Sequence, residues 1–561
     1  MVQISLVNRQ QMLSCLCIII GYLIFVIFAL SLRMGFVFPQ WLYWMSFVFV
    51  SIPLLYEVIY WKNSSKLRLL CLLSLSLMIS LQYAVVDTSS FLSSEDAVAD
   101  YNLTYDIIST TKWTIPKSGA WYFAYEYVFY PVTNFIYATM SLLTGIPLLL
   151  VVKYLFIIKA LVVTPLILRF FRNFFNERVA YLATTLFLAS PGAILFPHKE
   201  GFALIFFILG IYAIIKSEKL RPYSLIGIIS IITLVMTHHF STYVFLGFLV
   251  TLYFGINFHK SQKGDIANRR HISNYLLFSF VAFVAWVGFN SFPIVASHQN
   301  TIVDMFLSFI SPGSSTLTEV LPIYAMYEKI IIYTGLAIIA TSTVIGFLIY
   351  LRNKKNYSVN FFWISIFLII LVAVGSFLRF SPNRESVLIS HRVLEFGYIA
   401  IGAFSTIFFF WVLKSRKKLS TNLIVISAII IMILTGPILG AMHPRNMQIT
   451  SSVVSSKSLS VNAWMSKSNA TYEYTVGDHL MYFVLSIYGD CKVAKYPEFF
   501  SDQNFSLPLN VRSTWSYVVT YVYMFDIYGL NSTRFGGTPN FNTLYTNGML
   551  NVYGVTNRTS S

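Results

Sequence analysis

Long apolar runs alternate with short polar segments over residues 1–441. A helix needs roughly 20 mainly apolar residues to cross a bilayer. The runs predict about thirteen membrane-spanning helices, at residues 12–32, 38–60, 67–86, 144–168, 179–195, 201–216, 222–237, 240–258, 275–295, 329–351, 360–379, 392–413 and 421–441. The predicted fold class is therefore an α-helical polytopic membrane protein. A charged fraction of only 11% agrees with this, because soluble domains carry roughly 25%.

Basic residues gather in alternate loops between these runs. Just over half of the 39 Lys and Arg residues lie in the N-terminal segment and in the loops after every second run. Such loops favour the cytoplasmic side. We therefore predict a multi-pass protein of the plasma membrane, with its N-terminus in the cytoplasm and its C-terminal part outside. The net charge of +17 reflects this distribution, and no nucleic-acid partner is predicted.

Two regions on the predicted outer side are long enough to fold. Loop 87–143 contains amphipathic stretches at 94–112 and 118–143, which predict helices lying along the membrane surface. Residues 1–441 form the predicted transmembrane domain, and residues 442–561 suffice for one small domain. That domain is predicted to be mixed α/β, with helices at 459–467 and 479–487 and strands at 472–476, near 493 and at 515–522.

An acidic run follows the third apolar run directly. Asp87, Glu95 and Asp96 lie here, in a chain with only 22 acidic residues. Carboxylates beside a membrane are costly unless they take a proton or hold a metal. We predict that all three are catalytic, with Asp87 or Asp96 as general base and Glu95 as helper. All three are also candidate ligands of a divalent cation such as Mg²⁺ or Mn²⁺. The alternative is a solvated loop with helix N-caps.

A very short turn between two apolar runs holds His198, Lys199 and Glu200. Lys199 would bind an anionic head group, and Glu200 would hold that contact in place. The alternative is a polar turn at the interface, from which the lysine reaches toward water. We predict that all three residues bind substrate.

His238 and His239 lie between two further runs on the same predicted side. A histidine there can donate to a phosphate, or it can cap a helix end in interfacial water. Adjacent helical residues point in different directions, so a shared metal site is not favoured. We predict that both line the substrate site.

The last polar group precedes and begins the twelfth run, with Arg384, His391, Arg392 and Glu395. Guanidinium groups bind phosphate through two parallel hydrogen bonds, so Arg392 and Arg384 are predicted to hold a phosphate. Arg392 and Glu395 are one helical turn apart and can pair, and a structural ion pair is the alternative. Outer acids together with outer bases suit transfer of a group from a lipid phosphate to a polar acceptor.

These residues resemble elements of the GT-C superfamily of integral membrane glycosyltransferases. In that superfamily an acidic motif opens the first large outer loop, where Asp87 and the Glu95–Asp96 pair lie here. The turn at 198–200 and the helix start at 392–395 look like elements of archaeal and bacterial members. The segment Tyr545–Tyr553 is similar to their Tyr-x-Asn-Gly-x-x-x-x-Tyr ending. A WWDYG-type signature of oligosaccharyltransferases does not occur, so transfer of a whole glycan to asparagine is not expected.

The resemblance implies an inverting hexosyltransferase of the cell envelope. Its donor would be a single sugar on dolichyl or undecaprenyl phosphate. The acceptor would be a glycan, a lipid-linked oligosaccharide or, in protein glycosylation, a protein. Some members of the superfamily need a divalent cation and others do not.

Two other functions fit the pattern less well. A glycan polymerase or ligase that uses lipid-diphosphate donors would rely on arginine-rich outer loops, whereas acids dominate here. A secondary transporter would place charges near the bilayer midplane, and Glu57 is among the few acids deep within a run.

The four cysteines predict no disulfide scaffold. Cys15, Cys17 and Cys71 lie in apolar runs, and Cys491 stands alone outside them. The lack of disulfides and the number of outer N-x-S/T sequences favour an archaeal surface protein.

Overall fold

The structure is a computed structural model. It describes residues 2–34, 39–60, 65–86, 95–113, 129–190, 199–217, 220–258, 265–291, 324–353, 359–379, 384–415, 419–439 and 464, together with five strands between residues 475 and 555.

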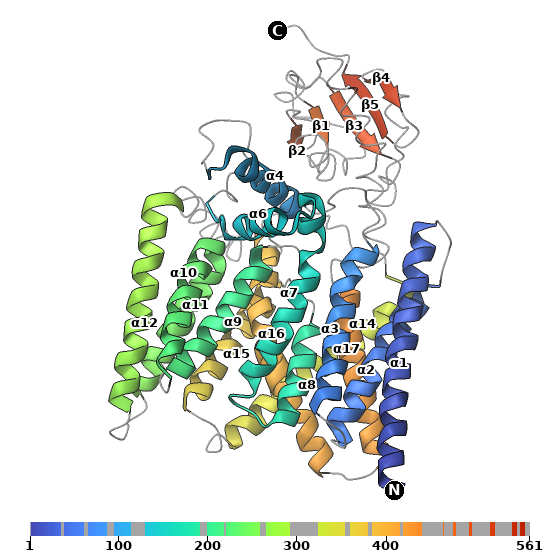
Figure 1. Ribbon diagram of the computed structural model, residues 1–561, viewed down its shortest axis with the longest axis vertical. Helices are drawn as coiled ribbons and strands as arrows, with labels where there is room; N and C mark the ends of the chain where they lie inside the picture. The colour runs from blue at the N-terminus through green and yellow to red at the C-terminus, as the bar shows by residue number, and fades with distance from the viewer. Residues whose placement is uncertain are drawn as a thin grey trace.

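Helices dominate the described part of the chain, and most of them stand side by side in one bundle (Figure 1). They are α1 (Val2–Arg33), α2 (Gln40–Tyr60), α3 (Ser65–Val86), α4 (Glu95–Thr110), α6 (Val132–Thr144), α7 (Leu148–Phe171), α8 (Glu177–Leu188), α9 (Lys199–Ser217), α10 (Pro222–Thr237), α11 (His239–Phe258), α12 (Asp265–Trp286), the π-helix η2 (Val287–Ser291), α14 (Met326–Arg352), α15 (Val359–Arg379), α16 (Arg384–Ser415) and α17 (Leu419–Leu439).

Eleven of the described helices are long and apolar enough to cross a membrane. The chain is therefore a multi-pass membrane protein, as the apolar runs predict. Each predicted run coincides with a described helix, but α8 has only 12 residues and α10 only 16. The expected number of thirteen spans is therefore not confirmed.

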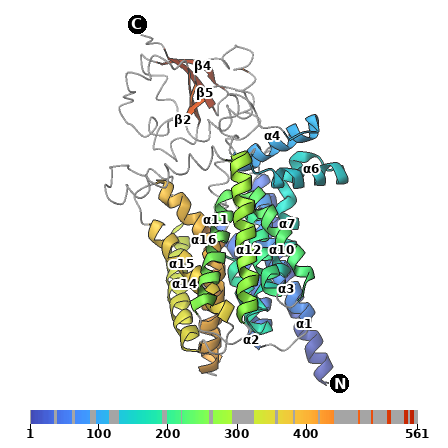
Figure 2. The ribbon, with the colours of Figure 1, turned by 90° about the vertical axis from the view of Figure 1, so that its left-hand side faces the viewer.

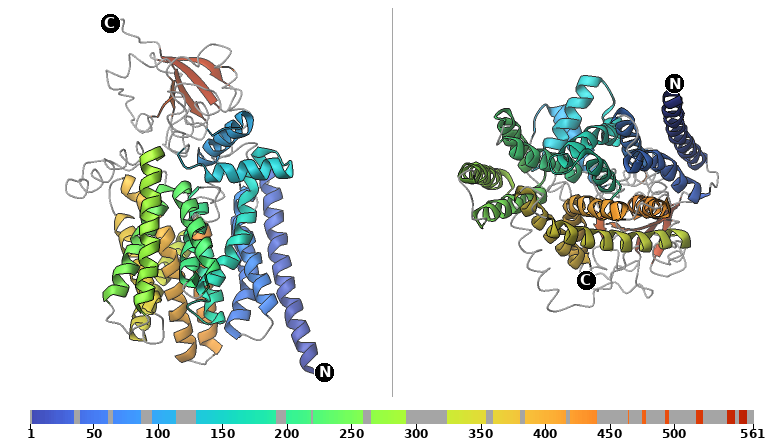
Figure 3. Two further views of the ribbon diagram at one scale, coloured as in Figure 1. Left: turned by 60° about the vertical axis from the view of Figure 1, so that its left-hand side comes forward. Right: turned by 90° about the horizontal axis from the view of Figure 1, so that it is seen from below.

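Two late helices, α16 and α17, occupy the middle of the bundle. Seen along the bundle axis, α16 and α17 lie between α14 and the helices of the first half of the chain, while α1 stands at the edge (Figure 3). This arrangement lets α16 contact both α14 and α8. Helix α16 thus brings residues from late in the chain against helices from its first half.

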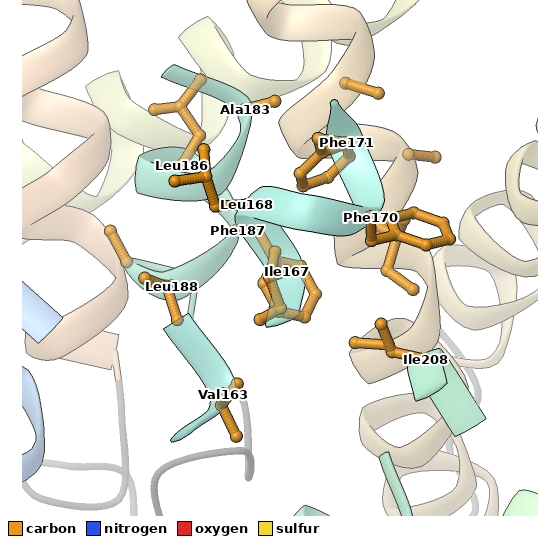
Figure 4. Close-up of a cluster of buried hydrophobic side chains, with 14 of the residues drawn as sticks. Val163, Ile167, Leu168, Phe170, Phe171, Ala183, Leu186, Phe187, Leu188 and Ile208 are labelled. Atoms are coloured by element: carbon orange, nitrogen blue, oxygen red, sulfur yellow. The ribbon is translucent and has the colours of Figure 1, made fainter. Parts of the chain in front are cut away.

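Apolar side chains fill the space between α7, α8 and α9. Val163, Ile167 and Phe171 of α7 belong to the same buried cluster as Leu186 and Phe187 of α8 (Figure 4). Nine of the twelve residues of α8 are buried, so this short helix is enclosed by protein on nearly every side.

Glycines allow close backbone contact between helices. A methyl group at Gly346 of α14 would overlap the backbone carbonyl of Phe404 on α16, and one at Gly436 of α17 would overlap that of Ala189. In lipid the hydrophobic effect contributes little to helix association. Close van der Waals packing at small residues therefore supplies much of the free energy that holds membrane helices together.

Helices α4 and α6 run across one end of the bundle instead of along it (Figures 1 and 2). Helix α4 coincides with the amphipathic stretch at 94–112, and α6 with the second half of the stretch at 118–143. Helix α6 ends at Gly145, whose φ of 70° is the left-handed conformation that favours glycine.

A five-stranded sheet lies at the same end of the molecule (Figure 2). Its strands are β1 (Thr475–Gly477), β2 (Val493–Lys495), β3 (Tyr517–Tyr521), β4 (Phe541–Thr546) and β5 (Leu550–Val555), in the order β2-β1-β3-β5-β4. β1 pairs in parallel with β2 and β3, whereas β5 is antiparallel to β3 and β4.

The predicted strands in this region agree with β1, β2 and β3, and the hairpin of β4 and β5 is an addition. The predicted helices at 459–467 and 479–487 lie outside the described residues apart from position 464, so the mixed α/β character stays a prediction. The N-terminal end and the sheet lie at opposite ends of the bundle (Figure 1). Which end faces the cytoplasm stays a prediction.

We expect Gly346→Ala to lower the stability of the protein by about 2 kcal/mol, because the added methyl group forces α14 away from α16. Thermal melting of the detergent-purified protein measures this. Gly288→Ala is the matched control, because a Cβ there meets no atom within 4 Å. A Gly346→Ala protein as stable as the control would contradict the close contact.

Candidate functional site

Helix α9 begins with two charged residues that contact different parts of the molecule. Lys199 contacts the surface helices α4 and α6, and Glu200 contacts the α10–α11 junction and α16. Through these contacts both residues lie at the end of the bundle that carries α4 and α6.

Lys199 is buried, and acceptors surround its ammonium group. Nζ lies 3.2 Å from Asp100 Oδ1, and it donates to the backbone oxygen of Tyr130 at 3.0 Å and to Asn134 Oδ1 at 3.3 Å. The Asp100 side chain is 0% exposed and that of Lys199 6%. A pair so far removed from water is held firmly, because either charge alone would be costly there.

Asn134 of α6 links the two charged groups of this cluster. Its amide Nδ2 donates to the backbone oxygen and to Oδ1 of Asp100, at 3.0 and 3.1 Å, and to Thr104 Oγ1 at 3.2 Å. Its amide oxygen meanwhile accepts from Lys199. Since one side chain contacts α4 and α9 together, the surface helices have a fixed position on the bundle.

Helix α12 holds the same region from a second direction. Trp286 Nε1 donates to the backbone oxygen of Phe129 at 3.1 Å, next to the Tyr130 carbonyl that Lys199 contacts. The Trp286 ring also stacks on Trp113, with centroids 6.1 Å apart. The segment leading into α6 is therefore fixed on both sides.

One carboxylate oxygen of Glu200 contacts two basic side chains. Its Oε1 lies 2.9 Å from Arg392 Nε on α16 and 3.5 Å from His238 Nε2. The Arg392 side chain is 41% exposed and that of Glu200 18%. This second cluster therefore differs from the first, because solvent reaches it.

The two histidines lie at a break between helices. His238 has extended backbone angles, φ −161° and ψ 124°, and it separates α10 from α11, which begins at His239. Both are buried, their rings are 5.0 Å apart, and the His239 ring lies 5.3 Å from that of Tyr130. The structure thus places the pair between the Lys199 and Glu200 clusters.

A buried lysine on α7 adds a charge that was not predicted. Lys159 is 3% exposed, its Nζ lies 5.0 Å from the ring centroid of Phe202, and Glu395 acts on it electrostatically. Glu395, one turn after Arg392, is 9% exposed. Ionisable side chains thus continue from Arg392 along α16 to Glu395 and on to Lys159 of α7.

The structure brings four of the predicted site residues together: Glu200, His238, His239 and Arg392. Lys199 is adjacent and Glu395 is one turn deeper, while His391 is exposed. Asp87 and His198 lie outside the described residues. Glu95 and Asp96 begin α4 and Arg384 begins α16, but only the backbone of these three is described.

Asp100, Asn134 and Lys159 were not among the predicted site residues. Asp100 belongs to the acidic run and follows Asp96 by one turn, so helical spacing could have drawn attention to it. A lysine inside an apolar run, such as Lys159, is itself a signal of function. Asn134 carries no such signal, because its importance comes only from its neighbours.

No metal site is evident in the part of the chain that the structure describes: no three His, Cys, Asp or Glu residues there are arranged to hold an ion. The candidate ligand Asp87 lies outside that part, as do the side chains of Glu95 and Asp96. A divalent cation therefore stays a prediction.

Comparison with solved structures identifies the fold. The structure of ArnT from Cupriavidus metallidurans bound to undecaprenyl phosphate aligns with 88% of this chain and 98% of its own, with a TM-score of 0.50 and 9% sequence identity. The chain has the GT-C glycosyltransferase fold. The resemblance noted from the sequence is confirmed at this level.

Two further GT-C structures align less closely. The oligosaccharyltransferase of Archaeoglobus fulgidus, in complex with Zn and sulfate, gives a TM-score of 0.45 at 12% identity and covers 81% of this chain and 68% of its own. The mycobacterial arabinofuranosyltransferase AftD gives 0.48 at 10% identity, over 88% of this chain and 42% of its own. No protein-family model and no curated protein matches the sequence.

We expect Lys199→Met to destabilise the protein by about 3–5 kcal/mol, because it leaves the Asp100 carboxylate buried without its cation. Adding Asp100→Asn should recover part of the loss. Thermal melting of the purified variants provides the measurement. The control is Arg172→Met, which breaks the exposed pair with Glu177 and should cost under about 1 kcal/mol. Equal losses in the two single variants would argue against the buried pair.

Proposed function

We propose that the chain is a glycosyltransferase of the plasma membrane that moves a single sugar from a polyprenyl-phosphate donor to an acceptor outside. The carrier is dolichyl or undecaprenyl phosphate, and the acceptor is a glycan, a lipid-linked oligosaccharide or a protein. The N-terminus is then cytoplasmic and the sheet lies outside. The observation that carries the proposal is the partly exposed Arg392 beside Glu200 and His238, within a GT-C fold.

Arg392 is the group best suited to the donor phosphate. Its side chain is 41% exposed and lies near the start of a membrane-spanning helix, which suits contact with a lipid phosphate at the membrane boundary. A guanidinium matches phosphate oxygens through parallel hydrogen bonds and stabilises the charge of a leaving phosphate. The likeness to ArnT, which was solved with undecaprenyl phosphate, supports a donor of this class.

Lys199 has a different part in this proposal. Its ammonium is buried and engaged by Asp100, Asn134 and Tyr130, so it positions the surface helices and does not bind the donor. Asp96 precedes Asp100 by one turn, and the two positions lie on one face of α4. The Lys199 cluster therefore fixes where the acidic start of α4 lies.

The reaction needs a base at that acidic start. Asp96 or Asp87 takes the proton of the acceptor hydroxyl, or of its amide, while the acceptor atom bonds to C1 of the sugar. The bond between C1 and the phosphate oxygen breaks, and its electron pair leaves with the polyprenyl phosphate, next to Arg392. Attack from the side opposite the phosphate inverts the configuration at C1. Glu95 assists the base or serves as a metal ligand.

Sugar transfer from radiolabelled polyprenyl-phosphate hexoses in membranes tests this function. We expect Asp96→Asn or Asp87→Asn, whichever removes the base, to lower transfer by about 10²–10⁴-fold. The matched control is Asp106→Asn on the exposed side of α4. Partial burial raises the pKa of Asp106, so its ionised form is disfavoured in the folded protein, and a neutral side chain should not destabilise it.

Two outcomes would contradict the proposed function. If every donor fails, or if both acid variants match the wild type while remaining folded, the catalytic assignment is wrong and transport becomes the function to test. Transfer only from lipid-diphosphate donors would instead indicate a polymerase or ligase.

A further inference from the structure

We propose that Glu200 is the internal counter-ion of the donor-phosphate site. Its carboxylate holds Arg392 while no donor is bound, the incoming phosphate displaces it, and Glu200 then stays paired with His238. This inference rests on the proposed function, because it assumes that Arg392 binds the phosphate of a polyprenyl donor. It assigns Glu200 a positioning role and involves no covalent step.

One carboxylate oxygen of Glu200 serves both partners. Glu200 Oε1 lies 2.9 Å from Arg392 Nε and 3.5 Å from His238 Nε2. The carboxylate can therefore lose the arginine and keep the histidine with only a small movement. Its two partners lie on α16 and at the α10–α11 junction, so the carboxylate can keep one contact while it gives up the other.

The two neighbouring ion pairs differ in how readily their partners can exchange. The pair of Lys199 and Asp100 has side chains 6% and 0% exposed, so opening it would strand charges away from water. In the pair of Arg392 and Glu200 the side chains are 41% and 18% exposed. Solvent can support both charges as that pair opens, and such pairs are individually weak.

Ser241 fixes the orientation of the His238 ring. The backbone N–H of Ser241 donates to His238 Nδ1 at 3.4 Å, and the Ser241 hydroxyl lies 2.9 Å from the same atom. In the neutral ring the hydrogen is then on Nε2, the atom that faces Glu200. His238 is therefore already oriented to donate a hydrogen bond to the Glu200 carboxylate once Arg392 binds the donor phosphate.

Competition between two anions for one guanidinium has a measurable consequence. A carboxylate and a phosphate both match the arginine fork, and they repel each other when both lie beside it. Donor binding is then weaker than Arg392 alone would allow. Removing the charge of Glu200 should strengthen binding, whereas removing a purely structural contact would leave binding unchanged or weaken it.

The test measures binding of undecaprenyl phosphate to the purified full chain and to its variants. We expect Glu200→Gln to lower the dissociation constant about fivefold and Arg392→Ala to raise it about tenfold. In turnover, Glu200→Gln should lower the KM for the donor, because the donor binds more tightly. Asp106→Asn is the control on the same protein and should leave binding unaltered.

A double-mutant cycle separates exchange from a general effect of charge. If Glu200 competes for Arg392, then Glu200→Gln should no longer tighten binding in the Arg392→Ala background. Tightening that persists there would reflect only the local electrostatic field and would overturn the proposal. Equal or weaker binding by Glu200→Gln in the otherwise wild-type chain would overturn it as well.

Glu200→Asp provides a second variant should the Gln variant not fold. It keeps the charge but shortens the side chain by one methylene, which weakens the contact with Arg392, so binding should tighten by a smaller factor. Unchanged binding by a folded Asp variant would count against the exchange. A wild-type chain that binds no polyprenyl phosphate would instead refute the proposed function.

Discussion

The buried ion pair between Asp100 and Lys199 is the constraint on which the rest of the site depends. Asp100 and Lys199 approach to 3.2 Å with almost no exposed surface, and Asn134 and Tyr130 also accept hydrogen bonds from the ammonium. Charges buried in this way tolerate only arrangements in which each keeps its partner. Helices α4 and α6, which lie across the end of the bundle, therefore have one defined position relative to α9.

The next residue along the chain behaves in the opposite way. Glu200 follows Lys199 directly, yet its partner Arg392 is partly exposed and lies on α16. One peptide bond thus joins a permanent contact to an exchangeable one. Because Lys199 is held in place, the backbone at Glu200 is fixed as well. Glu200 can therefore change partners without moving α9. Pre-organised supports of this kind are what positioned phosphate sites require.

The sequence predicts the helices of this fold well and their mutual contacts poorly. Apolar runs of sufficient length locate each helix in the bundle, because the bilayer sets that length. Even so, α8 and α10 are shorter than a usual span, and enclosure of α8 by its neighbours explains why a short segment is still strongly apolar. The partners of Lys199 and Arg392 could not be predicted, since pairing between distant segments depends on the packed bundle. Lys159 could have been noticed from its place in an apolar run.

The long sequence separation between Glu200 and Arg392 has a consequence for biogenesis. A chain emerging from the ribosome can join α4, α6 and α9 soon after α9 is inserted, because their contacts span residues 100 to 199. The arginine arrives only when α16 enters the membrane, after α14 and α15. A nascent or truncated chain therefore carries docked surface helices without the cation proposed to hold the donor. Under the proposed function, such a chain would not turn over a lipid-linked donor before the bundle is nearly complete.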